Sequence, residues 1–218
     1  MATVVLTATK WEQRPVRRAL ARMIARGDVR LMICGIGPRQ EMDCCRLLGD
    51  MADVERLLLV GWAGGLHPDM GAGEAIVADC VLDEAGRRAP CSVPAVPGAR
   101  VGPTLTVAEA LLSPQAKRAA RASGALAVEM EAYPLAAWAA ARGIPFAHVR
   151  LISDGPNDNL PDFRPALDPS GRLRPLALLA HPRLAFDLAR LSLRLLRLER
   201  RLGALARKAV SSMNQDRA

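Results

Sequence analysis

Aromatic residues are scarce in this chain of 218 residues, at 3% of the total. Proteins that bind single-stranded nucleic acid stack the bases on aromatic side chains, so the composition argues against that class. The formal net charge of +8 does not reverse this argument, because a net +6 of it lies between Arg183 and Lys208. The rest of the chain is nearly balanced in charge. We therefore expect no nucleic-acid partner.

Signals for metal binding, secretion and membrane insertion are also missing. The five cysteines include no Cys-x-x-Cys pair, and the three histidines show no metal-ligand spacing, so no metal site is expected. The apolar run 3–8 is followed at once by Lys10 and Glu12, unlike a signal peptide. No uncharged apolar stretch reaches the roughly 18 residues of a membrane span. These absences predict a cytoplasmic protein with free thiols.

Short β-rich runs alternate with helical runs over the first 150 residues, which is typical of a sheet covered by helices. Strands are predicted at residues 3–7, 29–34, 57–60, 75–82, 125–128 and 146–152. Helices are predicted at residues 12–25, 38–48, 106–112, 114–122 and 133–142, with two more after residue 173. Segments 83–103 and 155–171 are predicted loops, because they are rich in Gly and Pro. The expected fold is α/β, with three layers (α/β/α) and a mixed central sheet.

Four segments place glycines or acids directly after predicted strands. They are 34–37 (Cys-Gly-Ile-Gly), 60–66 (Val-Gly-Trp-Ala-Gly-Gly-Leu), 128–132 (Val-Glu-Met-Glu-Ala) and 149–154 (Val-Arg-Leu-Ile-Ser-Asp). Glycines at such places let the backbone approach a ligand closely, and loops at strand ends hold the ligand site of an open α/β sheet. Each segment alone is equally well explained as a turn or a helix start.

Taken together, these segments resemble the nucleoside phosphorylase and nucleosidase superfamily. Segment 60–66 is similar to the family signature Gly-Ser-Ala-Gly-Gly-Leu, and segment 71–79 is similar to the strand that follows it. Segments 128–132 and 149–154 resemble the remaining signatures, and residues 8–12 resemble the end of the first strand. The order of these landmarks is that of the family. The resemblance implies an enzyme that cleaves the bond between a purine base and ribose.

The resemblance also implies roles for individual residues. Asp154 would be the general acid that gives or shares a proton with N7 of the base, held in place by Ser153, and a dry, apolar setting would keep its proton on near neutral pH. Glu131 would accept hydrogen bonds from the ribose hydroxyls, and Met130 would pack against the nucleoside. Glu12 would orient the nucleophile. The predicted substrate-binding set is completed by Glu129, Ala63, Gly64 and Gly37.

Two positions depart from the family pattern and leave the nucleophile open between phosphate and water. Trp62 stands where the family usually has a Ser or Thr that helps to hold phosphate, and Leu59 stands where many members carry an arginine for it. Arg14, Arg39 and Arg150 are alternative anion ligands, although each is also expected as an ordinary surface or strand-end cation. No cofactor is expected beyond phosphate as a co-substrate.

The C-terminal part of the chain predicts an amphipathic helix rich in Leu and Arg. Leucines recur at alternating spacings of four and three, at positions 184, 188, 191, 195, 198, 202 and 205. One interpretation is a helix packed on the sheet or on a second subunit, forming a homodimer. The other is a helix that lies on an anionic lipid surface at the inner face of the membrane.

A narrower resemblance connects this helix with a substrate. Segment 104–107, the Pro-rich loop after Asp154 and the Arg/Leu-rich end are similar to the hopanoid-associated phosphorylases of bacteria. That resemblance implies that adenine is removed from adenosylhopane, a nucleoside linked to a lipid. The predicted domains are then a catalytic domain 1–172, a helical extension 173–208 and a disordered tail 209–218. Two alternatives remain, a water-using nucleosidase for soluble methylthioadenosine or adenosylhomocysteine and a non-catalytic, membrane-associated binding protein.

Overall fold

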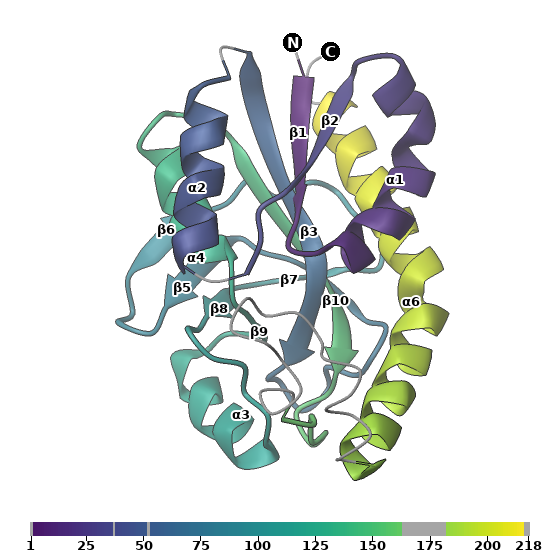
Figure 1. Cartoon of the computed structure of the whole chain (residues 1–218). Coiled ribbons are helices and arrows are strands. Elements are labelled where there is room, and N and C mark those ends of the chain that lie inside the picture. Colours follow the sequence, from purple (N-terminus) through teal and green to yellow (C-terminus); the bar gives the residue numbers. More distant parts are fainter. Residues whose placement is uncertain (1, 37, 52, 163–181, 216–218) are drawn as a thin grey trace.

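A computed structural model describes residues 2–36, 38–51, 53–162 and 182–215, drawn in colour in Figure 1. The strands are β1 (Ala2–Thr7), β2 (Val29–Ile33), β3 (Val54–Gly65), β4 (Ala75–Val77), β5 (Cys80–Asp83), β6 (Arg88–Pro90), β7 (Arg100–Val101), β8 (Thr104–Thr106), β9 (Ala127–Glu129) and β10 (Phe146–Asp154). The helices are α1 (Lys10–Ala25), α2 (Pro38–Gly49), α3 (Pro114–Ala120), α4 (Ala132–Ala140) and α6 (Pro182–Gln215), with a 3-10 turn at Arg121–Ser123.

A mixed sheet forms the middle of the molecule, as predicted. The long strand β3 pairs in parallel with β1 and β10, and β1 pairs in parallel with β2. Antiparallel pairs join β3 to β9 and β10 to β4, while β5, β6 and β8 continue the sheet beyond β9. Because β3, β9 and β10 are neighbours, the segments that follow or end these strands meet in space although they are far apart in sequence.

Two helical layers cover the faces of the sheet, which confirms the predicted α/β/α architecture (Figure 1). Alternate residues along β1 and β3 point to opposite faces, as the two-residue period of a strand requires. Leu58 and Val60 belong to the apolar core under α1 and α6, whereas Leu57 and Leu59 belong to the core under α2 and α4. Apolar cores therefore cover both faces of the central strands and exclude water from them.

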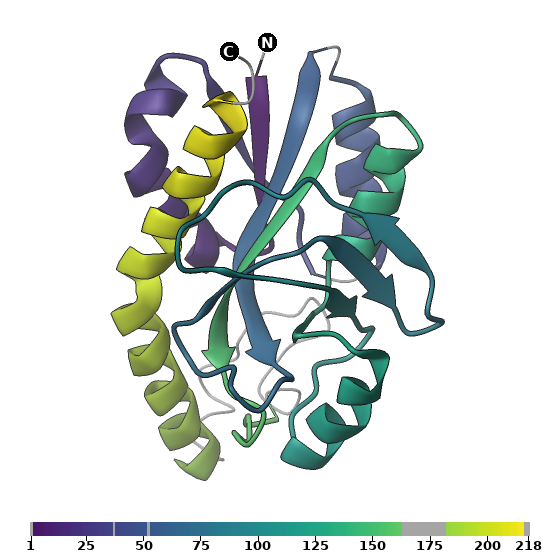
Figure 2. The same ribbon diagram turned by 180° about the vertical axis from the view of Figure 1, so that it is seen from behind.

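Helix α6 is part of this core. It runs beside α1 along the sheet (Figure 2), and its buried residues include Leu202, Leu205 and Val210. The predicted leucine seam is buried from Leu198 to Leu205 and half-buried before that, so the interpretation of a helix packed on the sheet holds for its C-terminal part. The predicted disordered tail 209–218 is wrong for residues 209–215, because α6 continues to Gln215 and buries Ala209 and Met213.

Three predicted elements need correction. Residues 106–112 are not helical, since Thr104–Thr106 forms β8, whose threonines pair with β5 and β9. The predicted strand 75–82 is two strands. The first, β4, pairs with β10, whereas the second, β5, lies between β6 and β8 and pairs with both. Segment 61–65 is not a turn but the second half of β3. Apolar runs predicted these elements, but pairing partners decided their limits.

Within the described residues, no helix is long and apolar enough to cross a membrane. The N-terminal half of α6 nevertheless exposes large apolar side chains to solvent. The most exposed are Phe186 (68%), Leu193 (56%) and Leu196 (49%). These three residues, called the outer stripe below, lie on the side of α6 that faces away from the sheet.

Candidate functional site

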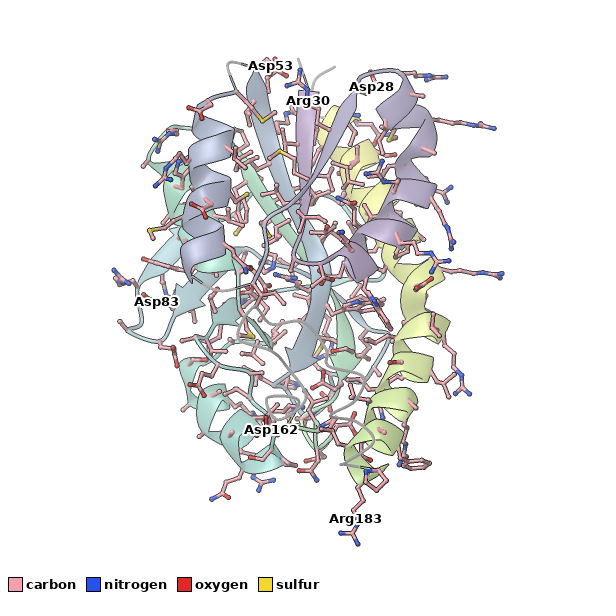
Figure 3. The ribbon with its side chains drawn as sticks, in the orientation of Figure 1. Asp28, Arg30, Asp53, Asp83, Asp162 and Arg183 are labelled. Carbon is pink, nitrogen blue, oxygen red and sulfur yellow. The ribbon has the colours of Figure 1, made fainter. Side chains whose placement is uncertain are left out.

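A cavity of about 600 Å³ opens where β3, β9 and β10 end. It lies toward the same end of the molecule as Asp162, opposite the end that carries Arg30 and Asp53 (Figure 3). Every predicted site residue that the structure describes lines this cavity, namely Glu12, Ala63, Gly64, Glu129, Met130, Glu131, Ser153 and Asp154. The remaining predicted residue, Gly37, lies outside the described residues.

The first half of the site is centred on Arg150, which β10 places inside the protein with no exposed surface. Its Nη2 donates hydrogen bonds to Oε2 of Glu129 at 2.6 Å and to Oε2 of Glu131 at 2.8 Å. Its Nη1 lies 3.9 Å from Oε1 of Glu12. Burial alone lowers the pKa of Arg150, but the three carboxylates raise it above its ordinary value. Arg150 is therefore a permanent buried cation, and the expectation of an ordinary strand-end or anion-binding arginine is wrong.

His148 holds the back of the Arg150 side chain. Nε of Arg150 donates to Nε2 of His148 at 2.7 Å, so the ring must carry its proton on Nδ1. That nitrogen lies 3.1 Å from Oγ1 of Thr104 and donates to it. Burial and then the charge of Arg150 lower the pKa of His148 well below its ordinary value, which keeps the ring neutral. The histidine is structural, as predicted, but it orients the central cation of the site.

Glu129 is saturated with protein partners. Besides Arg150, its Oε2 accepts hydrogen bonds from the backbone N–H groups of Glu131 at 3.0 Å and Ala132 at 2.8 Å. Its Oε1 accepts a short hydrogen bond from the Thr106 hydroxyl. With its oxygens so engaged, Glu129 clamps the start of α4 to β8 and β10. Glu129 therefore shapes the site, and its predicted contact with the substrate stays a prediction.

Glu131 has one oxygen free of protein hydrogen bonds in this network. Burial raises its pKa to about 8, and the neighbouring carboxylates Glu129 and Glu12 add to the rise while Arg150 opposes it. One arginine thus faces three acidic groups, and the cluster holds a proton on Glu131 at neutral pH. The free carboxyl oxygen can donate or accept a hydrogen bond in the cavity.

Glu12 is fixed at the start of α1. Its Oε2 accepts from the backbone N–H of Thr9 at 2.9 Å, which completes a capping box with the Thr9 side chain. Its Oε1 accepts from the N–H of Trp62 at 2.9 Å. A Cβ on Gly61 would lie 2.3 Å from both Glu12 Oε1 and Arg150 Nη1, so only glycine leaves room for the pair. This requirement explains part of the glycine signature.

The second half of the site is centred on Asp154, at the end of β10. Its Oδ1 accepts from Oγ of Ser153 at 2.5 Å, so Ser153 holds the carboxyl group as predicted. Its Oδ2 lies 2.5 Å from Nζ of Lys117, which α3 contributes and which is completely buried. The predicted dry setting is present, but it contains a cation as well. No motif in the sequence distinguished Lys117 from an ordinary helix-surface lysine.

The remaining wall of the cavity is apolar. Met130 is half-buried beside the acids, in the predicted position. Leucines from separate segments complete the wall, namely Leu111, Leu160, Leu188, Leu191 and Leu195. The last three belong to the leucine seam of α6. Among the described residues, no cluster of three or more His, Cys, Asp or Glu side chains has the arrangement of a metal site.

The described lining of the cavity carries little positive charge. Lys117 is its one lysine or arginine, and that side chain is paired with Asp154. Of the predicted alternative anion ligands, Arg14 is exposed on α1, Arg150 is occupied by carboxylates, and the side chain of Arg39 lies outside the described residues.

Comparison with known proteins gives a partial family match. The model of the phosphorylase superfamily matches residues 97–168, a segment that contains Lys117, the Glu129–Glu131 motif and Asp154. A search of curated protein sequences finds no match.

Solved structures with the same fold include nucleosidases and a hydrolase. The 5'-methylthioadenosine/S-adenosylhomocysteine nucleosidase of S. pneumoniae has a TM-score of 0.69 at 16% identity, covering 98% of this chain and 100% of that chain. The corresponding nucleosidase of Helicobacter pylori has a TM-score of 0.65 at 14% identity, with coverage of 100% and 99%. Futalosine hydrolase of Helicobacter pylori has a TM-score of 0.65 at 14% identity, with coverage of 100% and 98%.

At these identities the likeness is one of fold, and it extends over the whole chain including α6. Together with the superfamily match over residues 97–168, it confirms the resemblance of this chain to the nucleoside phosphorylase and nucleosidase superfamily.

Proposed function

We propose that this protein cleaves the N-glycosidic bond of a purine nucleoside, with Asp154 as the general acid. The observation that carries this proposal is the convergence of Glu12, Glu131 and Asp154 on one cavity. In this reaction positive charge develops on the ribose and negative charge on the departing base. Carboxyl groups near the sugar and an acid near the base therefore lower the barrier. The names of the structural neighbours support the same kind of reaction.

Glu131 suits the ribose end of the substrate. Its pKa of about 8 means that it is mainly protonated at neutral pH before charge develops on the ribose. Positive charge on the ribose favours the ionised form, because opposite charges attract strongly in a buried site. The interaction is then stronger in the transition state than with the bound substrate, which is the condition for raising the rate.

Water is the nucleophile that the charges of the cavity favour. A phosphate dianion would meet the acidic cluster around Glu12, and the lining cation Lys117 is already paired. Glu12 lies in the cavity with Oε1 between Trp62 and Arg150, where a carboxylate can orient a water molecule. We therefore favour hydrolysis over phosphorolysis.

The apolar wall supports a substrate with a large apolar substituent on its ribose. A methylthio group needs little room, whereas the leucines of α6 extend the cavity well beyond a nucleoside-sized polar site. Adenosylhopane, whose substituent is a polycyclic hydrocarbon, fits this chemistry. Soluble methylthioadenosine or adenosylhomocysteine is the alternative substrate.

A contact between α6 and an anionic membrane is supported by the outer stripe. Its residues are solvent-exposed, and Arg183, Arg190 and Arg197 are exposed around them on the same helix. Apolar side chains flanked by arginines favour anionic lipid surfaces. A lipid-linked nucleoside would reach the cavity from that surface. The predicted homodimer stays a prediction, and a second subunit on this stripe would exclude the membrane.

The reaction is tested by identifying its products. The protein is incubated with 5'-methylthioadenosine and with adenosylhopane, each with and without phosphate. We expect adenine and a free sugar whether or not phosphate is present, and a faster reaction with adenosylhopane. A sugar phosphate would show that phosphate is the nucleophile.

Asp154→Asn tests the general acid. Removing acid catalysis costs roughly 10²–10⁴-fold in kcat. The matched control is Asp28→Asn, at an exposed position at the opposite end of the molecule (Figure 3), which should keep the wild-type rate. A rate near wild type in Asp154→Asn would remove Asp154 from the mechanism.

Membrane contact is tested with vesicles of anionic and of neutral lipid. Replacing Phe186, Leu193 and Leu196 by Ser should reduce co-sedimentation with anionic vesicles by about tenfold or more, since each buried methylene contributes about 0.8 kcal/mol. The control replaces Met42 and Leu47, exposed on α2, by Ser. Equal binding of the triple variant and the wild type would reject the membrane contact.

A further inference from the structure

Lys117 is a completely buried lysine to which the proposed reaction assigns no role. Burying an ammonium group costs several kcal/mol unless it is paired and its hydrogen bonds are satisfied. Such a residue must either stabilise the fold or serve the site beside it. Because Lys117 contacts the proposed general acid, Asp154, substitutions of Lys117 can distinguish a role in folding from a role in the reaction.

The ammonium group of Lys117 is held rigidly by three acceptors. Nζ donates to Oδ2 of Asp154 at 2.5 Å, to the carbonyl oxygen of Gly155 at 2.8 Å and to that of Asp158 at 3.2 Å. These three bonds match the three donors of an ammonium group. Nothing in this arrangement needs an additional partner, so the position of the charge beside Asp154 is fixed.

The turn that supplies the two carbonyl groups is itself clamped. The carboxylate of Asp158 accepts from the N–H of Gly155 at 3.1 Å and from Arg194 of α6 at 2.6 Å. Burial raises the pKa of Asp158, but the hydrogen bonds from that N–H and from Arg194, together with the charges of Arg194 and Lys117, lower it below its ordinary value. Asp158 therefore stays ionised, and Asp154 is the one carboxylate that forms a hydrogen bond with Lys117 within the described residues.

We propose that Lys117 is a positioning residue for Asp154, which stabilises the carboxylate that Asp154 becomes after it has given its proton to the departing base. This inference rests on the proposed function. When the O–H bond of Asp154 breaks, an N–H bond forms at N7 of the purine, and the electron pair of the C1′–N9 bond moves to the base. Asp154 obtained its proton from solvent water, and Lys117 keeps all three of its own.

The energetic argument follows from burial. Without Lys117 the proton transfer would leave a lone carboxylate in a dry cavity, which is strongly unfavourable. With Lys117 the same step ends in an ion pair whose hydrogen bonds are already made. The cation therefore stabilises the product of the proton transfer without touching the substrate.

The test compares Lys117→Met with wild type on two leaving groups. On 5'-methylthioadenosine, whose base needs a proton, kcat should fall by about 100-fold while KM changes little. On p-nitrophenyl riboside, whose leaving group departs without a proton, kcat should stay within about threefold of wild type. Lys117→Arg keeps the cation and should recover part of the loss, whereas Arg118→Met, an exposed neighbour on α3, should cause none. Equal losses on both leaving groups would overturn the proposal and leave Lys117 a structural residue.

A second measurement does not depend on turnover. In protein labelled with ¹³C at the Asp carboxyl carbons, Asp154→Asn identifies the Asp154 signal. At pH 7 this signal should move in Lys117→Met and stay near its wild-type position in Lys117→Arg, because the first variant removes the stabilising cation. An unchanged signal in a folded Lys117→Met protein would refute the electrostatic link. Failure of wild type to cleave any nucleoside would instead refute the proposed function.

Discussion

Two buried ionic groups contribute residues to the lining of the cavity, and their charges are balanced differently. Around Arg150 there are three carboxyl groups for one cation. Around Asp154 there is one cation for one carboxyl group, and the spare donors of Lys117 go to backbone carbonyls. The first group has an excess of acid and retains a proton. The second pairs one carboxyl group with one cation.

The difference indicates a division of labour in the proposed reaction. An excess of buried acid that becomes charged as the ribose becomes positive stabilises the sugar end. A fixed cation beside the carboxyl group at the other end stabilises the carboxylate that remains after proton transfer to the base. Burial is nearly equal in the two groups, so their different properties come from the ratio of cations to carboxyl groups and not from the depth of the site.

The largest effect is expected when the central cation of the first group is removed. Arg150→Met leaves Glu12, Glu129 and Glu131 buried without a cation, and breaking a buried pair costs about 3–5 kcal/mol. The free energy of unfolding, measured with urea, should fall by that amount at pH 7. The loss should shrink at pH 5, where the carboxyl groups bind protons instead of remaining charged.

Arg30→Met is the matched control for this variant. Arg30 forms a two-pronged pair with Asp53 at 2.7 and 2.8 Å, but both side chains are substantially exposed. Exposed pairs contribute about 1 kcal/mol or less. Equal losses of unfolding free energy in the two variants would mean that the ion pairs of Arg150 contribute no more to stability than an exposed pair.

A second effect, of similar size, is expected for the dependence of stability on pH. Glu131 has an ordinary pKa of 4.5, and burial raises it to about 8 in the folded protein. Between these values the folded state binds one proton more than the unfolded state, so the free energy of unfolding falls as pH rises. For one such group acting alone the slope reaches about 1.4 kcal/mol per pH unit.

Glu131→Gln removes this titrating group and should flatten the decline of stability between pH 5 and pH 8. The measurement is a series of urea unfolding curves at several pH values, with Asp28→Asn as the exposed control that keeps the wild-type slope. If the free energy of unfolding of Glu131→Gln declines with pH as steeply as that of wild type, the proton is bound by another carboxyl group of this cluster.

Much of the fold could be predicted from local patterns. The β-branched, apolar run of β1 and the capping residues of α1 are readable without any partner. Gly27 and Gly143 have the positive φ values of 78° and 65° that a left-handed helix stop requires. The split of residues 75–82 into two strands was not readable, because both halves are apolar and only their pairing with different strands separates them.

The acidic residues of the candidate site could be predicted from the sequence, whereas the roles of its cations could not. Glu131 and Asp154 stand in motifs, whereas Lys117 stands in an ordinary helical sequence with no distinguishing neighbour. Arg150 did leave a signal, since it stands with His148 in a predicted strand whose other residues are apolar. A charge in such a strand must have buried partners, and those partners are the acids.

The order of motifs along the chain, the periodicity of the strands and the inward-facing leucines of α6 were determined by the sequence itself, because each depends on residues a few positions apart. Tertiary structure alone decided that Lys117 meets Asp154, 37 positions away, and that Arg150 meets three glutamates from two other segments. The physical reason is that ion pairs of this kind form only where packed elements exclude water, and no local spacing encodes which charges will be enclosed together.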